Sequence, residues 1–212
     1  LWQEGRSDDK GPEPEAVVFG EVDGVPCLFV GLERTNAVCV FDVTDPANAA
    51  LVDVIDIPGE SGLSAFGPEG LKFLSASSSP LGVATLAVTS EVGGVLSLFK
   101  VSAQITHQHI ASAVGVNGEG EIVAYDAGSG NFFVTNPDTD SLDVFSYSAG
   151  VLTLHSSIAL AGAPNSCDVY NGLVAVAVEG ATKQDLGQVQ FFDAASFAQS
   201  PSVTVGALPD ML

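Results

Sequence analysis

The sequence predicts an all-β protein, a β-propeller of four-stranded antiparallel blades with about four blades present. Two observations lead to this fold. A pattern of β-rich runs returns four times along the 212 residues, and the starts of the repeats are 54, 52, 44 and 45 residues apart, at Glu15, Glu69, Glu121, Asn165 and Asp210. Four antiparallel strands repeating about every 40–50 residues are typical of propeller blades. No segment shows the 3.6-residue apolar period of an amphipathic helix.

Each repeat is centred on a hairpin. The first reads CLFVGL-ERTN-AVCVFDV (Cys27 to Val43), two apolar runs around four turn residues, and the others span 85–101, 131–147 and 173–194. One strand-like run precedes each hairpin and another follows it, at 51–57, 105–111, 151–158 and 202–205. Each unit therefore has four strands. We expect the first strand of a fifth blade to begin at Asp210.

The main alternative is a Greek-key sandwich, whose strands have one wet face and should alternate apolar with polar residues. Runs such as LVAVAV (Leu173 to Val178) are apolar at both parities. This is the pattern expected for sheets packed on both faces by neighbours, which favours a propeller. Because propellers usually close with about four to eight blades, we expect self-association, or an adjoining chain or domain, to complete the arc.

The composition limits the partners. Asp and Glu number 26 against 6 Lys and Arg, a formal charge of -20. Such a charge repels nucleic acid and anionic lipid surfaces and suits metal cations or basic partners. The longest apolar runs are far shorter than the roughly 20 residues of a membrane span, so direct membrane insertion is not expected.

The cysteines do not form a disulfide framework. If the first hairpin turns between Arg34 and Thr35, Cys39 faces Val30 and not Cys27, which disfavours a Cys27–Cys39 bridge.

Acidic and amide residues recur at one rim of the predicted propeller. In an antiparallel blade, the start of the first strand and the end of the second lie on the same rim, and the first strand is innermost. First strands start at Glu15, Glu69, Glu121, Asn165 and Asp210; second strands end at or just before Glu33, Glu91, Asn136 and Glu179. Converging oxygen ligands suit Ca²⁺. The seven carboxylates are therefore candidate metal ligands. Alternatively, these side chains cap backbone N–H groups and hold blade to blade.

Other candidate sites are weaker. His107 and His109, two apart on an outer strand, could form a two-histidine metal site, although we expect that strand to be exposed. The acidic leader Arg6 to Glu15 could hold calcium or could be a solvated segment. The loop Ser75 to Gly82 is a candidate O-glycan site. No nucleophile elbow, HExxH motif or P-loop is present, so no catalytic residue or organic cofactor is predicted.

Several long motifs resemble the choice-of-anchor I domain family, which includes mesenchyme-specific cell-surface glycoproteins linked to biomineralisation. They are RSDDKGPEPEAVVFGEVDGVPCLFVGLERTNAVCVFDVTDP, FGPEGLKFL, TSEVGGVLSLFKV, GEIVAYDAGSGNFFVTN and PNSCDVYNGLVAVAVEGATKQDLGQVQFFDA. The resemblance implies an extracellular or cell-surface propeller. Calcium association would be in keeping with the family and would fall on the acidic rim. Some relatives carry phosphatase-like labels.

The order of the motifs departs from the family pattern. Residues 1–103 hold two blades that resemble the closing half of the family domain, and residues 104–212 hold two blades and a first strand that resemble its opening half. A circular permutation and an excerpt across two tandem domains both fit. The leading hypothesis is a non-enzymatic structural or adhesive module that assembles into a filament or surface layer through tandem or head-to-tail contacts. The alternative is an extracellular metal-dependent phosphoesterase.

Overall fold

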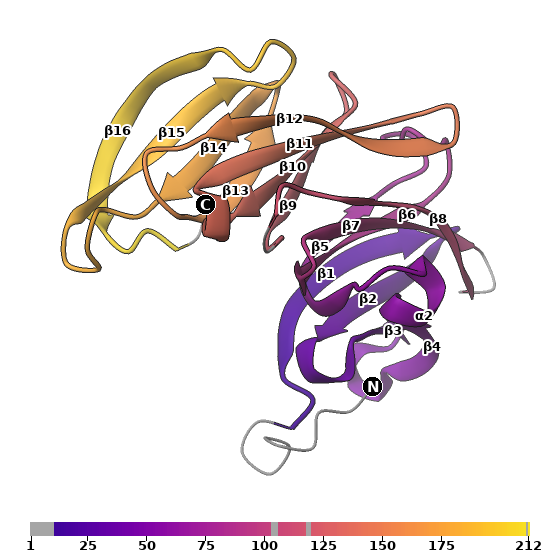
Figure 1. Ribbon diagram of the computed structural model, residues 1–212. Coiled ribbons are helices and arrows are strands. Elements are labelled where there is room, and N and C mark those ends of the chain that lie inside the picture. Colours follow the sequence, from indigo (N-terminus) through magenta and orange to yellow (C-terminus); the bar gives the residue numbers. More distant parts are fainter. Residues whose placement is uncertain (1–10, 103–105, 118–119, 211) are drawn as a thin grey trace.

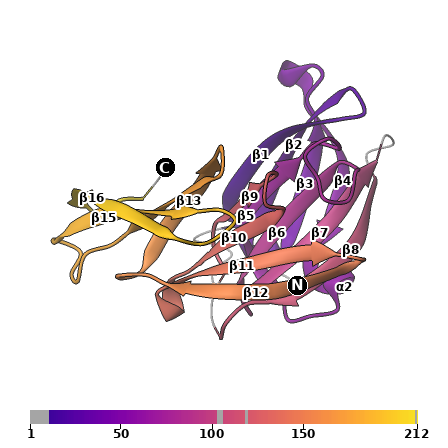
Figure 2. The same ribbon diagram turned by 90° about the horizontal axis from the view of Figure 1, so that it is seen from above.

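A computed structural model describes residues 11–102, 106–117, 120–210 and 212. These residues form four antiparallel sheets of four strands, and the strands of each sheet are consecutive in the chain. Figures 1 and 2 show the sheets following one another in chain order, with the indigo sheet at one end of the arc and the yellow sheet at the other. The propeller prediction is confirmed, and the sandwich alternative is not what the chain adopts.

The sheets are called blades 1 to 4. Blade 1 has strands β1 (Pro14–Val22), β2 (Val25–Leu32), β3 (Ala37–Asp42) and β4 (Ala50–Asp56). Blade 2 has β5 (Phe66–Leu74), β6 (Thr85–Val92), β7 (Val95–Ser102) and β8 (Thr106–Val114). Blade 3 has β9 (Val123–Asp126), β10 (Asn131–Asn136), β11 (Ser141–Ser148) and β12 (Val151–Ala159). Blade 4 has β13 (Pro164–Tyr170), β14 (Leu173–Val178), β15 (Leu186–Asp193) and β16 (Gln199–Ala207).

Helical segments within the described residues are short. The helix α2 (Ile57–Ser61) links blade 1 to blade 2, and three-residue 3-10 turns include η2 (Glu33–Thr35), η3 (Pro46–Asn48) and η4 (Pro137–Thr139). Among these residues no helix has the length and apolar character needed to cross a membrane.

The register of the first hairpin agrees with the sequence prediction. Val30 pairs with Cys39, and Cys27 pairs with Asp42. The three cysteines are free, and this register agrees with the prediction that Cys39 faces Val30 and not Cys27.

Two expected strands differ from prediction. Asp210 does not begin a strand in the described residues. The last strand, expected at 202–205, is longer and spans Gln199–Ala207.

The core lies between blades and not within a single sheet. One apolar cluster joins blades 1 and 2 around Phe29, Ile55 and Phe99. A second joins blades 2 and 3 around Leu98 and Phe132, and a third joins blades 3 and 4. Each blade therefore depends on its neighbour to bury its apolar side chains, which are the main source of stability.

One close approach at the first interface depends on a glycine. The Phe29 and Phe73 rings stack across blades 1 and 2 with their centroids 5.6 Å apart. A Cβ atom on Gly20 would lie 2.3 Å from the Phe73 ring. The absence of a side chain at Gly20 is therefore what lets β5 approach β1.

Candidate metal site at the channel mouth

The first strands of the four blades are innermost, as predicted. β1 contacts β5, β5 contacts β9, and β9 contacts β13. Together with the residues after β16 they line a cavity of about 450 Å³. Four of the acidic and amide residues predicted for the rim lie on its wall: Glu15, Glu69, Asn165 and Asp210.

A repeated β-bulge directs three of these side chains. At the start of β1, β5 and β13 a register shift leaves one extra residue without a partner on the second strand. A bulge re-aims the side chain of its extra residue. That residue is Glu15, Glu69 or Asn165, each directly after a proline, which has no N–H to offer the ladder.

In blade 3 the predicted rim residue, Glu121, precedes the first strand and does not lie at a bulge within it. β9 begins at Val123, two residues after Glu121, whose backbone N–H donates to the carbonyl oxygen of Thr135 over 3.1 Å. The Glu121 carbonyl accepts the hydroxyl of Thr89 from blade 2. A Cβ on Gly70 would collide with this carbonyl, so a glycine is needed where blades 2 and 3 meet at the channel.

Carboxylates crowd around Glu69. Burial first, and then the nearby negative charges of Glu91, Glu15, Glu33 and Glu121 in that order, together raise the pKa of Glu69 to about 7. Five of the predicted rim carboxylates are therefore close enough to repel one another. Loss of hydration and like charges both disfavour ionisation. A cation bound at this mouth would therefore stabilise the ionised carboxylates.

The tightest group lies beside blade 1. Carboxylate oxygens of Glu13, Glu15 and Glu33 lie within 4.8 Å of one another, which is close enough to hold a metal ion. Burial raises the pKa of Glu33, and a hydrogen bond with Glu13 adds to this effect. Arg34 sits against the group: its Nε is 2.6 Å from Glu13 Oε2, and its Nη2 is 3.3 Å from Glu33 Oε1.

The backbone explains how Glu13 and Arg34 come together. The N–H groups of Glu33 and Arg34 donate to the carbonyls of Glu13 and Pro12. These bonds hold the residues before β1 against the 3-10 turn that follows β2. The protein thus supplies one cation of its own to this carboxylate group.

The other predicted residues, Glu91, Glu179 and Asn136, lie in three different places. Glu91 and Glu33 both line a hollow of about 320 Å³ between blades 1 and 2. At blade 4, Asn165 Nδ2 donates to Glu179 Oε1 over 3.1 Å and to the Pro209 carbonyl over 3.0 Å. Glu179 and Asp210 therefore lie on the blade 4 side of the mouth. Asn136 points elsewhere, because its amide donates to Val116 and Asp143.

The structure therefore gathers the predicted carboxylates at one mouth, in two subgroups. The blade 1 and 2 side holds Glu15, Glu33, Glu69 and Glu91, with Glu121 near Glu69. The Asn165–Glu179 bond lies within blade 4 and joins no two blades. A side chain that does join blades 1 and 2 is Asn36, not one of the predicted rim residues, whose Oδ1 accepts the Gly67 N–H over 2.9 Å. Metal binding at the mouth stays a prediction.

Sequence reasoning did not assign Glu13 and Arg34 to the mouth. Glu13 belongs to the leader segment, of which residues 6–10 lie outside the described residues. The signal was present in the sequence: Glu13-Pro-Glu15 repeats the Pro-Glu pair of Pro68-Glu69, and Arg34 follows a predicted rim glutamate.

The two histidines on β8 lie on one face, as predicted, but the expected exposure is wrong. Both rings pack edge-on against Phe99. The His107 side chain is only 15% exposed, and its Nδ1 lies 2.7 Å from Asp53 Oδ2 of blade 1. His109 Nε2 bonds with Ser112. The His107–Asp53 contact joins the outer strands of blades 1 and 2, whereas His109 bonds within its own strand.

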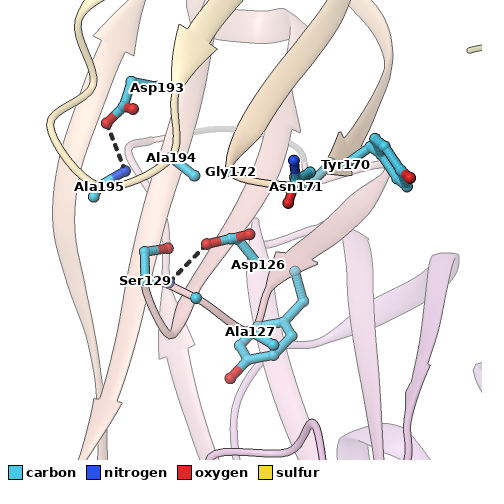
Figure 3. Close-up of a pocket in the computed structure, with 12 residues that line it drawn as sticks. Asp126, Ala127, Ser129, Tyr170, Asn171, Gly172, Asp193, Ala194 and Ala195 are labelled. Atoms are coloured by element: carbon cyan, nitrogen blue, oxygen red, sulfur yellow. Dashed lines mark hydrogen bonds between the residues drawn. The ribbon is translucent and has the colours of Figure 1, made fainter.

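The opposite mouth carries a different cavity, of about 570 Å³, lined by turn residues of blades 3 and 4. Figure 3 shows its two carboxylates, Asp126 and Asp193, on separate turns. Ser129 N–H donates to Asp126 over 2.6 Å. The backbone N–H and hydroxyl of Ser196, and then the Ala195 N–H, hold the pKa of Asp193 below its usual value. Each carboxylate therefore accepts hydrogen bonds from N–H groups of its own turn and stabilises that turn.

The geometry defines a class: a β-propeller arc with an acidic channel mouth. Solved structures with this fold include the hydrazine synthase of Kuenenia stuttgartiensis, at 14% identity and TM-score 0.70, matching 92% of this chain and 50% of that one. Sqt1 of Saccharomyces cerevisiae matches 91% of this chain and 48% of its own at 12% identity and TM-score 0.71. A Lactobacillus plantarum protein matches 90% and 56% at 19% identity and TM-score 0.69.

These likenesses concern the fold alone. The chain spans about half the length of the solved structures that it matches. A search of curated proteins found no match. The model of the choice-of-anchor I domain matches residues 2–46 and 121–212, together more than half of the chain. The protein belongs to the choice-of-anchor I domain family.

Proposed function

We propose that this chain is a non-enzymatic structural or adhesive propeller module of an extracellular or cell-surface protein, whose channel mouth binds Ca²⁺ and which joins further blades to form a filament or surface layer. The observation that supports the proposal best is the group Glu13, Glu15 and Glu33, with carboxylate oxygens within 4.8 Å. Calcium takes six to eight oxygen ligands, and its extracellular sites bind in roughly the 10⁻⁴–10⁻³ M range.

The electrostatics of the mouth support a cation. The chain carries a formal charge of -20. The pKa values of Glu69 and Glu33 are both raised, first by burial, so ionisation of either carboxylate is unfavourable in this place. A bound divalent ion would reverse these shifts, because an opposite charge favours the ionised carboxylate.

A structural role agrees with the thiol at the channel. Cys167 lines the cavity, and burial raises its pKa to about 12. A thiol that stays protonated is a poor nucleophile. The channel wall thus offers carboxylates for ligation and a thiol suited to packing.

The test is calcium-dependent melting. A ligand that binds only the folded form raises its stability, by about 2.7 kcal/mol at a hundredfold excess over Kd. We expect Ca²⁺ to raise the Tm of the wild type and not that of Glu15→Gln or Glu33→Gln. Glu21→Gln, an exposed residue on the same strand, is the matched control and should keep the response. An equal response in all four proteins would refute the site.

The second candidate is a metal-dependent phosphoesterase. The observation that favours it is the pKa of Glu69, about 7, which suits a general base near neutrality. A metal at the mouth would activate water. Turnover of a generic phosphoester that disappears with Glu69→Gln, while the protein stays folded, would establish this function over the structural one.

A further inference from the structure

The two end blades each have a sheet face with no described neighbour. On blade 1, alternate residues form two complete rows across all four strands, because the pairing register places them side by side. All eight are apolar: Val17, Val30, Cys39 and Val54 in one row, and Phe19, Leu28, Phe41 and Leu51 in the other. Val17 is 64% exposed and Phe19 60%. We call this surface the blade 1 end face.

Blade 4 ends the arc in a similar way. Its side toward blade 3 carries Val174, Val176 and Phe192, which are buried in the shared cluster. The opposite side carries a set of residues that alternates with these, and we call it the blade 4 end face. Its apolar residues are Ala175, Ala177, Val189, Phe191, Val203, Leu173 and Tyr170, and the same side also carries Ser166, Asp168, Asp193 and Ser200. Leu173 is 45% exposed and Val203 54%.

The two end faces are complementary by construction. Within the chain, the face that one blade turns toward its follower packs on the face that the follower turns back, and this happens at three interfaces. The blade 4 end face is the face that a blade turns toward the blade after it. The blade 1 end face is the face that a blade turns toward the blade before it. A second copy of the chain therefore supplies the kind of surface that each end face lacks.

We propose that the blade 1 end face of one copy packs on the blade 4 end face of a second copy, so that two copies close one ring of eight blades. Eight is within the usual range for propellers, and a head-to-tail contact that closes gives a finite assembly. The matched solved structures are about twice as long as this chain. The inference rests on the proposed joining of further blades and names a second copy as their source; the closed dimer, and not the single chain, would then be the unit of the filament or layer.

Two features set the strength of the contact. Each copy carries a formal charge of -20, so association should strengthen in high salt. Pro209 lies at the mouth end of the blade 4 end face, where its carbonyl accepts the Asn165 amide. Strand β1 of the second copy would begin there, so removal of residues 209–212 should tighten the contact.

The mass in solution is the first readout. The chain has a mass of 21.6 kDa, and we expect light scattering in high salt to give twice that value. Cysteine labelling is the second readout, because Cys39 lies on the blade 1 end face while Cys27 and Cys167 are buried. In the dimer Cys39 should be protected from a maleimide. A monomer at about 100 µM, above the micromolar Kd of weak interfaces, with Cys39 labelled in both the full chain and the truncated one, would overturn the inference.

Charge variants test the head-to-tail arrangement. Phe19→Lys on one face and Val203→Lys on the other should each give monomers, with unchanged circular dichroism. Mixed together they should associate more weakly than the wild type, because one of the two contacts of the ring is then unmodified and the other carries both lysines. Val151→Lys, an exposed valine on β12, is the control and should still dimerise. Failure of the mixture to associate while both variants are folded would also overturn the arrangement.

The calcium proposal can fail separately. Glu33→Gln should lose the calcium-dependent rise in Tm and still dimerise. The monomeric Phe19→Lys variant should keep that rise. Dimers without any calcium response would refute the mouth site and leave the end-face contact standing.

Discussion

Arg34 Nε lies 2.6 Å from Glu13 Oε2, so that one guanidinium offsets part of the negative charge of the group Glu13, Glu15 and Glu33. The same side chain reaches Glu33 over 3.3 Å. Arg34 is therefore in the place where a metal ion would supply positive charge.

Arg34→Gln should make the protein depend on calcium. Without calcium we expect the Tm to fall by about 2–4 °C, because the partly exposed pairs are worth about 1 kcal/mol. With calcium the rise in Tm should exceed that of the wild type, since the ion no longer competes with the guanidinium. Scanning calorimetry with and without Ca²⁺ measures both effects.

The control for total charge is Lys183→Gln, an exposed lysine on blade 4. It removes one positive charge from the chain and none from the mouth. If Lys183→Gln matched Arg34→Gln, the calcium effect would be general screening of the acidic chain.

Stability should fall between about pH 4.5 and 7 in the absence of metal. The folded protein raises the pKa of Glu69 from its ordinary 4.5 to about 7, so the folded state binds the proton more strongly than the unfolded chain does. The contribution of Glu69 is fully present below pH 4.5 and is lost as the pH rises through 7. Glu69→Gln should flatten this part of the curve and raise stability at pH 8.

Chemical denaturation of the wild type and Glu69→Gln at several pH values checks this. The raised pKa of Glu33 acts in the same direction, so a smaller slope should remain in the variant. An unchanged slope in Glu69→Gln would show that this carboxylate does not titrate as described.

Asn36→Ala should weaken the junction of blades 1 and 2. Its side-chain oxygen accepts the buried Gly67 N–H, and its backbone is left-handed at φ 57°. Leaving a buried N–H unpaired costs about 1–3 kcal/mol, and the left-handed conformation adds about 1 kcal/mol for alanine. Urea denaturation measures the sum; Asn48→Ala, at an exposed turn, should change stability by much less.

Asp143→Ala should be among the most damaging single substitutions. The Asp143 carboxylate is 1% exposed and accepts four hydrogen bonds, from the Val116 N–H, the Asn136 amide and the hydroxyls of Ser141 and Ser157. Removing the acceptor leaves several buried donors unpaired, and each unpaired donor costs about 1–3 kcal/mol. Asp138→Ala, an exposed carboxylate nearby, is the comparison, and equal losses in the two variants would contradict this role.

The repeat spacing and the strand patterns were enough to predict the blades. Apolar runs around four-residue turns fix the hairpins locally, so even the pairing of Val30 with Cys39 followed from the position of one turn. The rim positions followed from antiparallel geometry, because the start of a first strand and the end of a second must lie at the same edge.

What the carboxylates meet at that edge depends on the tertiary structure. The bulges at Glu15 and Glu69 and the return of Glu13 onto Arg34 arise when the strands of one blade pair. The crowding that raises the pKa of Glu69 arises only when separate blades pack together. Likewise, His107 reads as a surface residue until β8 lies beside β4 and Asp53. Local pattern determines strands because backbone pairing is short-range; site chemistry depends on distances between residues far apart in the chain, which only packing decides.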